Sequence, residues 1–164
     1  KRGYTFVELM VVIVLIGLML TLAVPRLRES LLTDTLKSTV RKMVGTIKYL
    51  RNEAVRERRP YVLHFDFESG SFWADYPDMT EEERTEAKKQ AFSFPKEVLL
   101  MDVWSKGEGK RADGETQILF SERGYVKQSA IHIGSEDGRK YTLVLSPFLG
   151  RVQVLEEYVE FEDS

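Results

Sequence analysis

The amino-acid sequence predicts an α+β protein in which a long N-terminal helix packs on a head of antiparallel β-sheet. Three observations support this fold class. An apolar run dominates the first 25 residues, an apolar stripe with helical spacing follows it as far as Ala54, and from Tyr61 onward apolar residues recur at every second position. Apolar residues three and four apart line one face of a helix, whereas a period of two is typical of a half-buried strand. A helix followed by successive strands is the order expected of an α+β fold.

Length and composition limit the possibilities further. The 164 residues suit one modest domain plus a terminal anchor, because the roughly 140 residues beyond the apolar run are enough to bury a core of their own. The formal net charge of −2 gives no overall attraction to nucleic acid or to anionic membranes. The absence of cysteine excludes disulfides, thiolate metal sites and cysteine nucleophiles.

The apolar run has the length of a membrane span. Starting at Phe6 and ending at Val24 it reaches about 19 residues, close to the ~20 that a helix needs to cross a bilayer. The stretch "LAVPRLRES" that follows is a poor signal-peptidase site, so a signal anchor is favoured over a cleavable signal peptide. A plain anchor leaves Glu8 unexplained, because a carboxylate within a spanning helix costs a few kcal/mol and usually has a functional partner.

The first nine residues, "KRGYTFVEL", resemble the processing site of type IV pilins and of the pseudopilins of type II secretion systems. In that family a basic leader ends in glycine, an aromatic residue begins the mature chain, and its fifth residue is a glutamate ahead of an apolar helix. Gly3, Tyr4 and Glu8 stand at those places, with tyrosine where phenylalanine is usual. The resemblance divides the chain into the end of a leader (1–3), a transmembrane assembly helix (4–25), an amphipathic continuation of that helix (26–59) and a β-rich periplasmic head (60–164).

The resemblance also implies a route of maturation and assembly. A prepilin peptidase cuts after Gly3, and the new amine of Tyr4 is then methylated. Glu8 is expected to pair with the Tyr4 amine of a neighbouring subunit, which offsets the cost of an unpaired carboxylate in hydrocarbon. Pro25 matches a proline that often kinks these helices, so a bend or local unwinding is expected between Thr21 and Pro25.

The segment 26–59 reads as an amphipathic helix. Its apolar residues are spaced by four and three between Leu36 and Ala54, and Pro60 predicts that the helix ends near Arg58. Ten Lys or Arg lie between Arg26 and Arg59, against four acidic residues. We interpret them as a solvated helix face, because the head supplies compensating acid; nucleic acid is the alternative partner and an unfavoured one.

The sequence of the head segment predicts a series of strands and one short helix. "YVLHFDF" and "SFWADY" form a hairpin, a strand lies near Val98 to Trp104, and further strands are "TQILFS", "AIHIG", "RKYTLVLS" and "GRVQVLE", with turns at "EDG" and "PFLG". Thr80 and Glu83 predict the capping box of a short exposed helix. The glycine-rich "SKGEGKRADGE" is expected to be a flexible loop.

The head narrows the resemblance. The order of "RNEAVRERRPYVLHF", "ILFSERGYV", "AIHI" and "YTLVLSPFLGRV" resembles minor pseudopilin H and its relatives among the minor pilins of type IV pili. One departure concerns the turn at Gly124. The family often has proline and aspartate before this glycine, whereas Glu122 and Arg123 stand here, which leaves the form of the turn open.

No pattern of residues indicates an enzyme, a cofactor or a metal site. His64 and His132 fall in separate predicted strands and are expected to be structural. Consecutive glutamates at 81–83 point in different directions on a helix and form no cage. A calcium site of the kind used by major pseudopilins is not expected, because its loop pattern is not recognisable around the acidic candidates Asp75, Asp78, Asp113 and Glu115.

The acidic tail "EEYVEFEDS" is expected to be a frayed, solubilising end. Alternatively, it extends the last strand or contacts a basic helix of a partner.

The resemblance therefore implies a structural subunit: a single-pass inner-membrane minor pseudopilin of a Gram-negative type II secretion system, near the tip of a periplasmic pseudopilus that helps to export folded proteins. Its expected partners are major and minor pseudopilins, the prepilin peptidase and the inner-membrane assembly platform, with no small-molecule substrate. The alternatives are a minor pilin of a type IV pilus that aids DNA uptake and an ordinary membrane-anchored binding module.

Overall fold

The computed structural model describes residues 5–147 and 150–162, and for residues 22–34 it describes the backbone only. The chain divides into two compact units, Lys1–Asp34 and Thr35–Ser164. Helix α1, Phe6–Glu57, contributes to both units. The predicted long N-terminal helix is confirmed. It is continuous through Pro25, so the local unwinding that the sequence predicted between Thr21 and Pro25 is absent from this backbone.

Helix α1 ends one residue before the position predicted from Pro60. Arg58 adopts a left-handed conformation with φ of 52°, which breaks the helical path. The amide of Arg59 still donates to the carbonyl of Ala54 over 3.2 Å and so satisfies one of the last free carbonyls of the helix. The chain then leaves at once into the first strand of the head.

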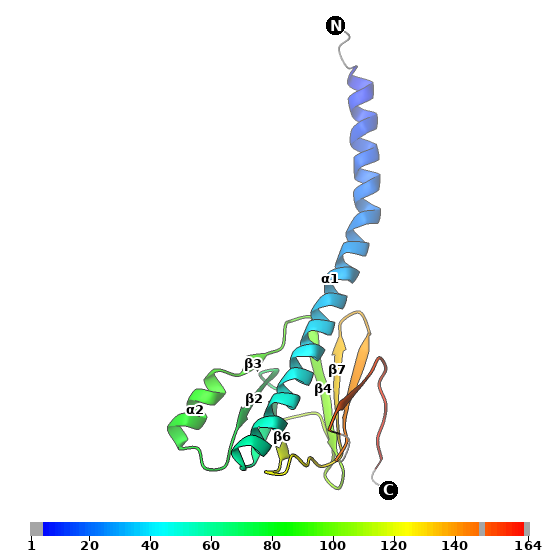
Figure 1. Cartoon of the computed structure of the whole chain (residues 1–164). Helices are drawn as coiled ribbons and strands as arrows, with labels where there is room; N and C mark the ends of the chain where they lie inside the picture. The colour runs from blue at the N-terminus through cyan, green and yellow to red at the C-terminus, as the bar shows by residue number, and fades with distance from the viewer. Residues whose placement is uncertain (1–4, 148–149, 163–164) are drawn as a thin grey trace. The chain divides into compact units, whose positions relative to one another are not determined.

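The described residues of the head form two antiparallel sheets and one short helix (Figure 1). The first sheet has the order β3-β2-β1-β6, formed by Phe92–Ser93, Ser71–Asp75, Tyr61–Asp66 and Glu115–Phe120. The second has the order β5-β4-β7-β8-β9, formed by Gly109–Arg111, Val98–Ser105, Ser129–Ser135, Lys140–Leu145 and Val152–Leu155. The α+β fold class predicted from the sequence is confirmed.

The second half of α1 joins the two sheets into one core. Its predicted stripe is at most 4% exposed at every position, namely Leu36, Val40, Met43, Ile47, Leu50 and Ala54. These side chains share one hydrophobic cluster with Leu63 and Phe65 from the first sheet and with Ile131 and Leu143 from the second. Full burial of each large apolar side chain contributes about 1.5–3 kcal/mol, so this half of the helix is the central element of the head.

Two local predictions of the head had different outcomes. Helix α2, Glu81–Lys89, begins with the predicted capping box: the Thr80 amide donates to the Glu83 carboxylate over 2.8 Å, and the Glu83 amide donates to the Thr80 hydroxyl over 3.2 Å. The prediction of a flexible loop at "SKGEGKRADGE" is wrong, because Gly109–Arg111 turns back as strand β5 and pairs with β4. The glycines there provide the tight turn of a hairpin, which sequence composition alone does not separate from a loop.

The turn at Gly124 keeps its glycine for a geometric reason. Gly124 has φ of 75°, and a Cβ placed on it would lie 2.9 Å from Cγ2 of Val55 on α1. Hydrogen bonds from the Ser121 amide to the Tyr125 carbonyl (2.9 Å) and from the Gly124 amide to the Ser121 carbonyl (2.8 Å) close the turn. Glu122 and Arg123, which stand where the family often has proline and aspartate, therefore still permit a tight turn.

Candidate functional site

The start of helix α1 is an apolar surface without a covering partner in the described chain. Every large hydrophobic residue from Phe6 to Leu20 is between 46% and 75% exposed. Soluble monomers rarely expose a contiguous apolar surface of this extent, so such a patch marks a membrane or a protein interface. In the portion whose side chains are described, no helical stretch is long and apolar enough to cross a membrane.

Glu8 takes part in the N-terminal cap of this helix. The Thr5 amide donates to Oε2 of Glu8, and the Glu8 amide donates to Oγ1 of Thr5, both over 3.3 Å. This reciprocal pair is a capping box, which satisfies two amides that the first turn of a helix leaves free. This capping role was not predicted from the sequence, although the signal is present in "TFVE", where a threonine precedes a glutamate by three positions.

The other residues of the predicted processing and assembly site are Gly3, Tyr4 and Pro25. Gly3 and Tyr4 lie outside the described residues. Pro25 is described by its helical backbone alone. Cleavage after Gly3, methylation of Tyr4 and the assembly roles of Glu8 and Pro25 therefore stay predictions.

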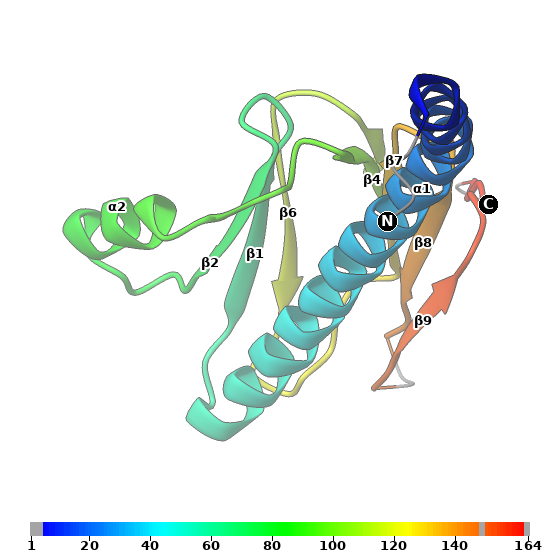
Figure 2. The same ribbon diagram turned by 90° about the horizontal axis from the view of Figure 1, so that it is seen from above.

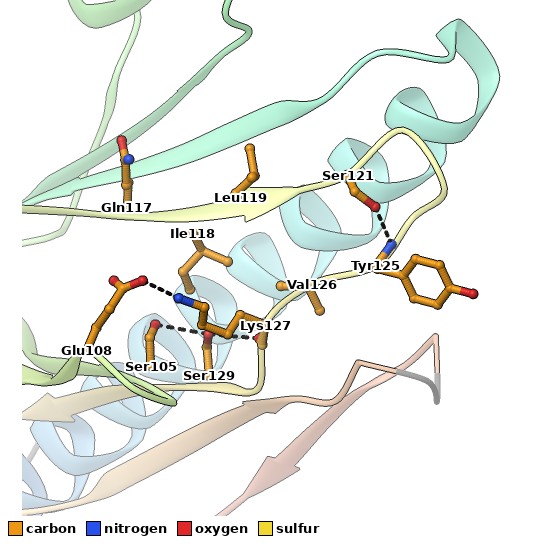
Figure 3. Close-up of a pocket in the computed structure, with 10 residues that line it drawn as sticks. All are labelled: Ser105, Glu108, Gln117, Ile118, Leu119, Ser121, Tyr125, Val126, Lys127 and Ser129. Carbon is orange, nitrogen blue, oxygen red and sulfur yellow. Dashed lines mark hydrogen bonds and ion pairs between the residues drawn. The ribbon is translucent and has the colours of Figure 1, made fainter. Parts of the chain in front are cut away.

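A cavity of about 430 Å³ in the head lies between β6 and the adjoining ends of β4 and β7 (Figure 3). The Oγ atoms of Ser105 and Ser129 are 3.0 Å apart within it, and Ser129 also donates to the Lys127 carbonyl over 3.0 Å. Lys127 forms an ion pair with Glu108 across the opening. These serines bond to one another and to backbone, and the two charged side chains of the lining, Glu108 and Lys127, pair with each other. The described lining therefore contains no serine–histidine pair.

His132 is a structural residue, as predicted. It is 1% exposed, its Nδ1 lies 2.6 Å from Oδ1 of Asp102, and its Nε2 lies 2.9 Å from the carbonyl of Val159. Both partners are acceptors when Asp102 is ionised, so the ring donates to both only with a proton on each nitrogen. Tyr158 stacks on the ring at 4.1 Å and donates to Asp102 over 3.0 Å. The cluster fastens the C-terminal tail and leaves no open position for a substrate.

His64 and the acidic candidates form no metal centre. His64 stacks on Trp73 with ring centroids 5.1 Å apart, and its Nε2 lies 3.0 Å from Oδ1 of Asp75, outside hydrogen-bond geometry. Glu115 is bound by Lys88 over 2.6 Å instead of facing other acids. Among the residues whose side chains the structure describes, no three His, Asp or Glu are gathered as metal ligands.

The described part of the tail is ordered against the sheet, contrary to the predicted frayed end. The Val159 amide donates to the Thr142 hydroxyl over 3.0 Å, and that hydroxyl donates to the Glu157 carbonyl over 2.6 Å. Phe161 stacks on Trp104 at 5.2 Å. Trp104, His132 and Thr142 alternate with core residues along β4, β7 and β8. Residues 157–161, which they hold, therefore cover the sheet face opposite helix α1. It does not extend the last strand, because β9 ends at Leu155.

An exposed apolar helix that begins with a Thr5–Glu8 capping box, in a chain that also has an α+β head, is the arrangement of a pilin-like subunit. Comparison with known proteins agrees with this class. Residues 1–24 match the prokaryotic N-terminal methylation motif, and residues 39–149 match the family of type II transport protein GspH. The second match covers more than half of the chain. The chain belongs to the GspH family of type II transport proteins.

Individual relatives fit this family. Type II secretion system protein H of Pseudomonas aeruginosa is 29% identical over 170 residues, which cover 94% of this chain and 96% of that protein. The crystal structure of the minor pseudopilin EpsH of Vibrio cholerae covers 78% of this chain and 98% of its own, with a TM-score of 0.54 and 14% identity. A second structure of the same pseudopilin gives a TM-score of 0.54 at 12% identity, with coverages of 77% and 99%. At these identities the two structures bear on the fold alone.

Proposed function

We propose that this chain is a minor subunit of a type II secretion pseudopilus, near the tip of that filament, where it assists the export of folded proteins. Membership of the GspH family favours this function over a minor pilin of a type IV pilus. The observation that carries the proposal is the exposed apolar start of α1, because a helix of this kind needs either lipid or other apolar helices around it.

In this proposal the apolar helix serves twice. It first holds the precursor in the inner membrane as a single span over residues 4–25, with the head in the periplasm. After a prepilin peptidase has cut behind Gly3, the same surface packs against the helices of other pseudopilins while the assembly platform lifts the subunit from the bilayer. Helices associate in hydrocarbon through close packing and polar contacts, so a single carboxylate within the span can fix their register.

Glu8 has two tasks in this scheme. In the single chain it caps α1 through Thr5. In the filament its carboxylate also meets the methylated amine of Tyr4 from a neighbouring subunit, since a carboxylate has acceptor capacity for more than one donor. The head contributes a folded surface to the filament. Its Ser105 and Ser129 hydroxyls bond to one another, and its His132 holds the C-terminal tail.

The intact mass of the protein purified from membranes tests the proposal. The chain is produced with its leader and the cognate prepilin peptidase, and the same chain without the peptidase is the control. The expected mass corresponds to a chain that begins at Tyr4 and carries one additional methyl group. An uncut chain, in cells where a control prepilin is cut, would contradict the proposal and leave residues 4–25 as a plain anchor.

A further inference from the structure

One flank of helix α1 in the head is strongly basic. Lys37, Arg41, Lys48 and Arg51 recur along it, and none of them forms an ion pair with any described residue. Residues 35–52 contain five Lys or Arg and no acidic residue, whereas residues 53–164 contain 15 Lys or Arg against 23 Asp or Glu. This part of the helix is therefore a basic strip on an acidic head. Its four basic residues on this flank are not neutralised by ion pairs with described acidic residues.

This flank forms one wall of a groove. An open depression of about 350 Å³ is lined by residues of α1, β8 and β9. Figure 2 shows β8 and β9 at the margin of the second sheet, beside α1. Its apolar lining consists of Val40 and Val44 from α1, Tyr141 from β8 and Val154 from β9. Val154 remains 39% exposed although it faces the helix side of the sheet, opposite the buried Leu143 of β8. The groove is therefore an apolar surface that the chain itself leaves partly uncovered.

Strand β9 offers a free edge at the same place. It pairs with β8 from Val152 to Leu155, and its other edge makes no backbone hydrogen bond to a described residue. An unpaired strand edge can take up a further extended chain, whose backbone supplies the missing donors and acceptors. A bound strand would place alternate side chains toward the wall of α1, where Lys37 and Arg41 stand.

One acidic group, Glu156, lies in the lining of the groove beside Tyr141. Burial of the Tyr141 hydroxyl, and then the charge of the Glu156 carboxylate, raise the pKa of Tyr141. Glu156 is not in an ion pair with Lys37 or Arg41. The cationic wall thus keeps its charge for a ligand.

We propose that the groove between α1 and β9 binds an extended segment with alternating acidic and apolar residues, contributed by a neighbouring subunit of the same pseudopilus. The segment adds to the free edge of β9, its apolar side chains cover Val44 and Val154, and its carboxylates meet Lys37 and Arg41. A polypeptide fits better than nucleic acid or an anionic lipid headgroup, because phosphate groups neither cover an apolar floor nor pair with a strand edge as a peptide backbone does. The source of the segment rests on the proposed function, whereas the chemistry of the groove does not.

Peptide binding to the full chain in detergent micelles tests the chemistry of the groove. The probes are a fluorescent peptide of alternating glutamate and valine, EVEVEVE, and its charge-reversed control KVKVKVK, followed by fluorescence anisotropy. We expect the acidic peptide to bind, with affinity that falls as salt is raised, and the basic peptide to bind at least tenfold more weakly. Hydrogen exchange of the β9 amides that point away from β8 is expected to slow when the acidic peptide is present.

Two neighbouring charge reversals provide a matched pair. Arg41→Glu reverses a charge in the groove, whereas Lys42→Glu reverses one on an exposed position outside its lining. We expect Arg41→Glu to weaken the acidic peptide at least tenfold and Lys42→Glu to change its affinity by less than twofold. Equal loss in both variants, no preference for the acidic peptide, or tighter binding of a single-stranded oligonucleotide or of anionic vesicles would each overturn the proposal.

The source of the segment is tested separately in cells that carry the whole secretion system. The chain has no cysteine, so Val154→Cys introduces a single site for a thiol cross-linker. The expected product joins this position to an acidic stretch of another pilin-like subunit, identified at the cross-linked residue by mass spectrometry. Addition of Glu8→Ala should remove the product while peptide binding in micelles is retained, which separates failure of assembly from failure of the groove. A product with any other partner would overturn the neighbouring subunit as the source.

Discussion

Thr5 and Glu8 cap helix α1 by exchanging two hydrogen bonds of 3.3 Å, each from the amide of one residue to the side chain of the other. The pilin resemblance implies that the same Glu8 carboxylate pairs with the Tyr4 amine of a neighbouring subunit. Capping needs only an acceptor oxygen at this position, whereas pairing with an amine in hydrocarbon needs a negative charge. The two roles can therefore be separated by substitution.

Glu8→Gln keeps an acceptor for the cap and removes the charge, so we expect the protein to insert into the membrane and to fail in assembly. Thr5→Ala removes a hydroxyl of the cap and keeps the charge, and should cost about 0.5–2 kcal/mol of helix stability while assembly continues. The measurement is the amount of this subunit in pseudopili sheared from cells, relative to the amount in membranes. We expect at least a tenfold loss for Glu8→Gln and less than a twofold loss for Thr5→Ala. Equal assembly of Glu8→Gln and the unchanged protein would exclude the charge pair.

Gly124 tests how closely the head packs against α1. We expect Gly124→Ala to lower the free energy of unfolding by about 1–3 kcal/mol, because its φ is 75° and its Cβ would lie 2.9 Å from Val55. Chemical denaturation of the full chain in detergent measures this cost. Adding Val55→Ala removes the clash and should recover part of the loss, while the backbone strain remains. No recovery would show that the positive φ alone sets the requirement for glycine.

Much of the fold was predictable because it depends on local periodicity. The spacing from Leu36 to Ala54 predicted a buried helix face, and the capping box at Thr80 predicted the start of a helix. The structure confirms both. The hairpin of β5 was missed, because its pairing with Val103 and Trp104 is a tertiary contact that glycine-rich sequence does not reveal. The order of the tail was missed for the same reason: its partners Thr142 and His132 lie on other strands.

The candidate site divides in the same way. The apolar run and Glu8 were visible in the sequence because a membrane or filament helix is defined by its composition. The groove beside β9 was not visible, since Val44, Tyr141 and Val154 come together only when α1 lies along the second sheet. The basic residues were noticed and interpreted as a solvated face. Their position beside a free strand edge gives them a more specific role in our proposal.

Asp66 provides a test of pH dependence in the β1–β2 turn. Its carboxylate accepts hydrogen bonds from the Ser69 hydroxyl (2.7 Å) and from the amides of Glu68 (2.9 Å) and Ser69 (3.3 Å). The Ser69 hydroxyl first, and then these amides, hold the pKa of Asp66 below its ordinary value of 3.8. A carboxyl whose pKa is lower in the folded state than in the unfolded state stabilises the fold at any pH above its unfolded-state pKa. This contribution is lost as the pH falls through its folded-state pKa.

We expect Asp66→Ala to lower the free energy of unfolding by about 1–2 kcal/mol at pH 7, the scale of hydrogen bonds to a charged acceptor. The deficit should shrink when the pH is brought well below 3.8, because the unchanged protein then loses the same charge. Urea denaturation of both proteins at pH 7 and pH 2.5 gives the comparison. Asp66→Asn retains an acceptor and should lose less at pH 7. A deficit that is constant with pH would mean that the charge plays no part in the turn.

His132 determines whether the tail stays on the sheet. His132→Phe keeps an aromatic ring of similar size and removes both bonds, to Asp102 and to the Val159 carbonyl. We expect the Val159 amide to exchange with solvent at least tenfold faster, because its own bond to Thr142 depends on the tail remaining docked. Thr142→Val removes a further tail attachment and should have an effect of the same direction. Amides in the buried half of α1 should keep their rates in both variants, since the bonds that these variants remove, at Val159 and Glu157, lie on the opposite face of the sheet. Faster exchange throughout the head would instead mean that His132 supports the core, and unchanged exchange at Val159 would mean that the stacking of Phe161 on Trp104 is enough to hold the tail.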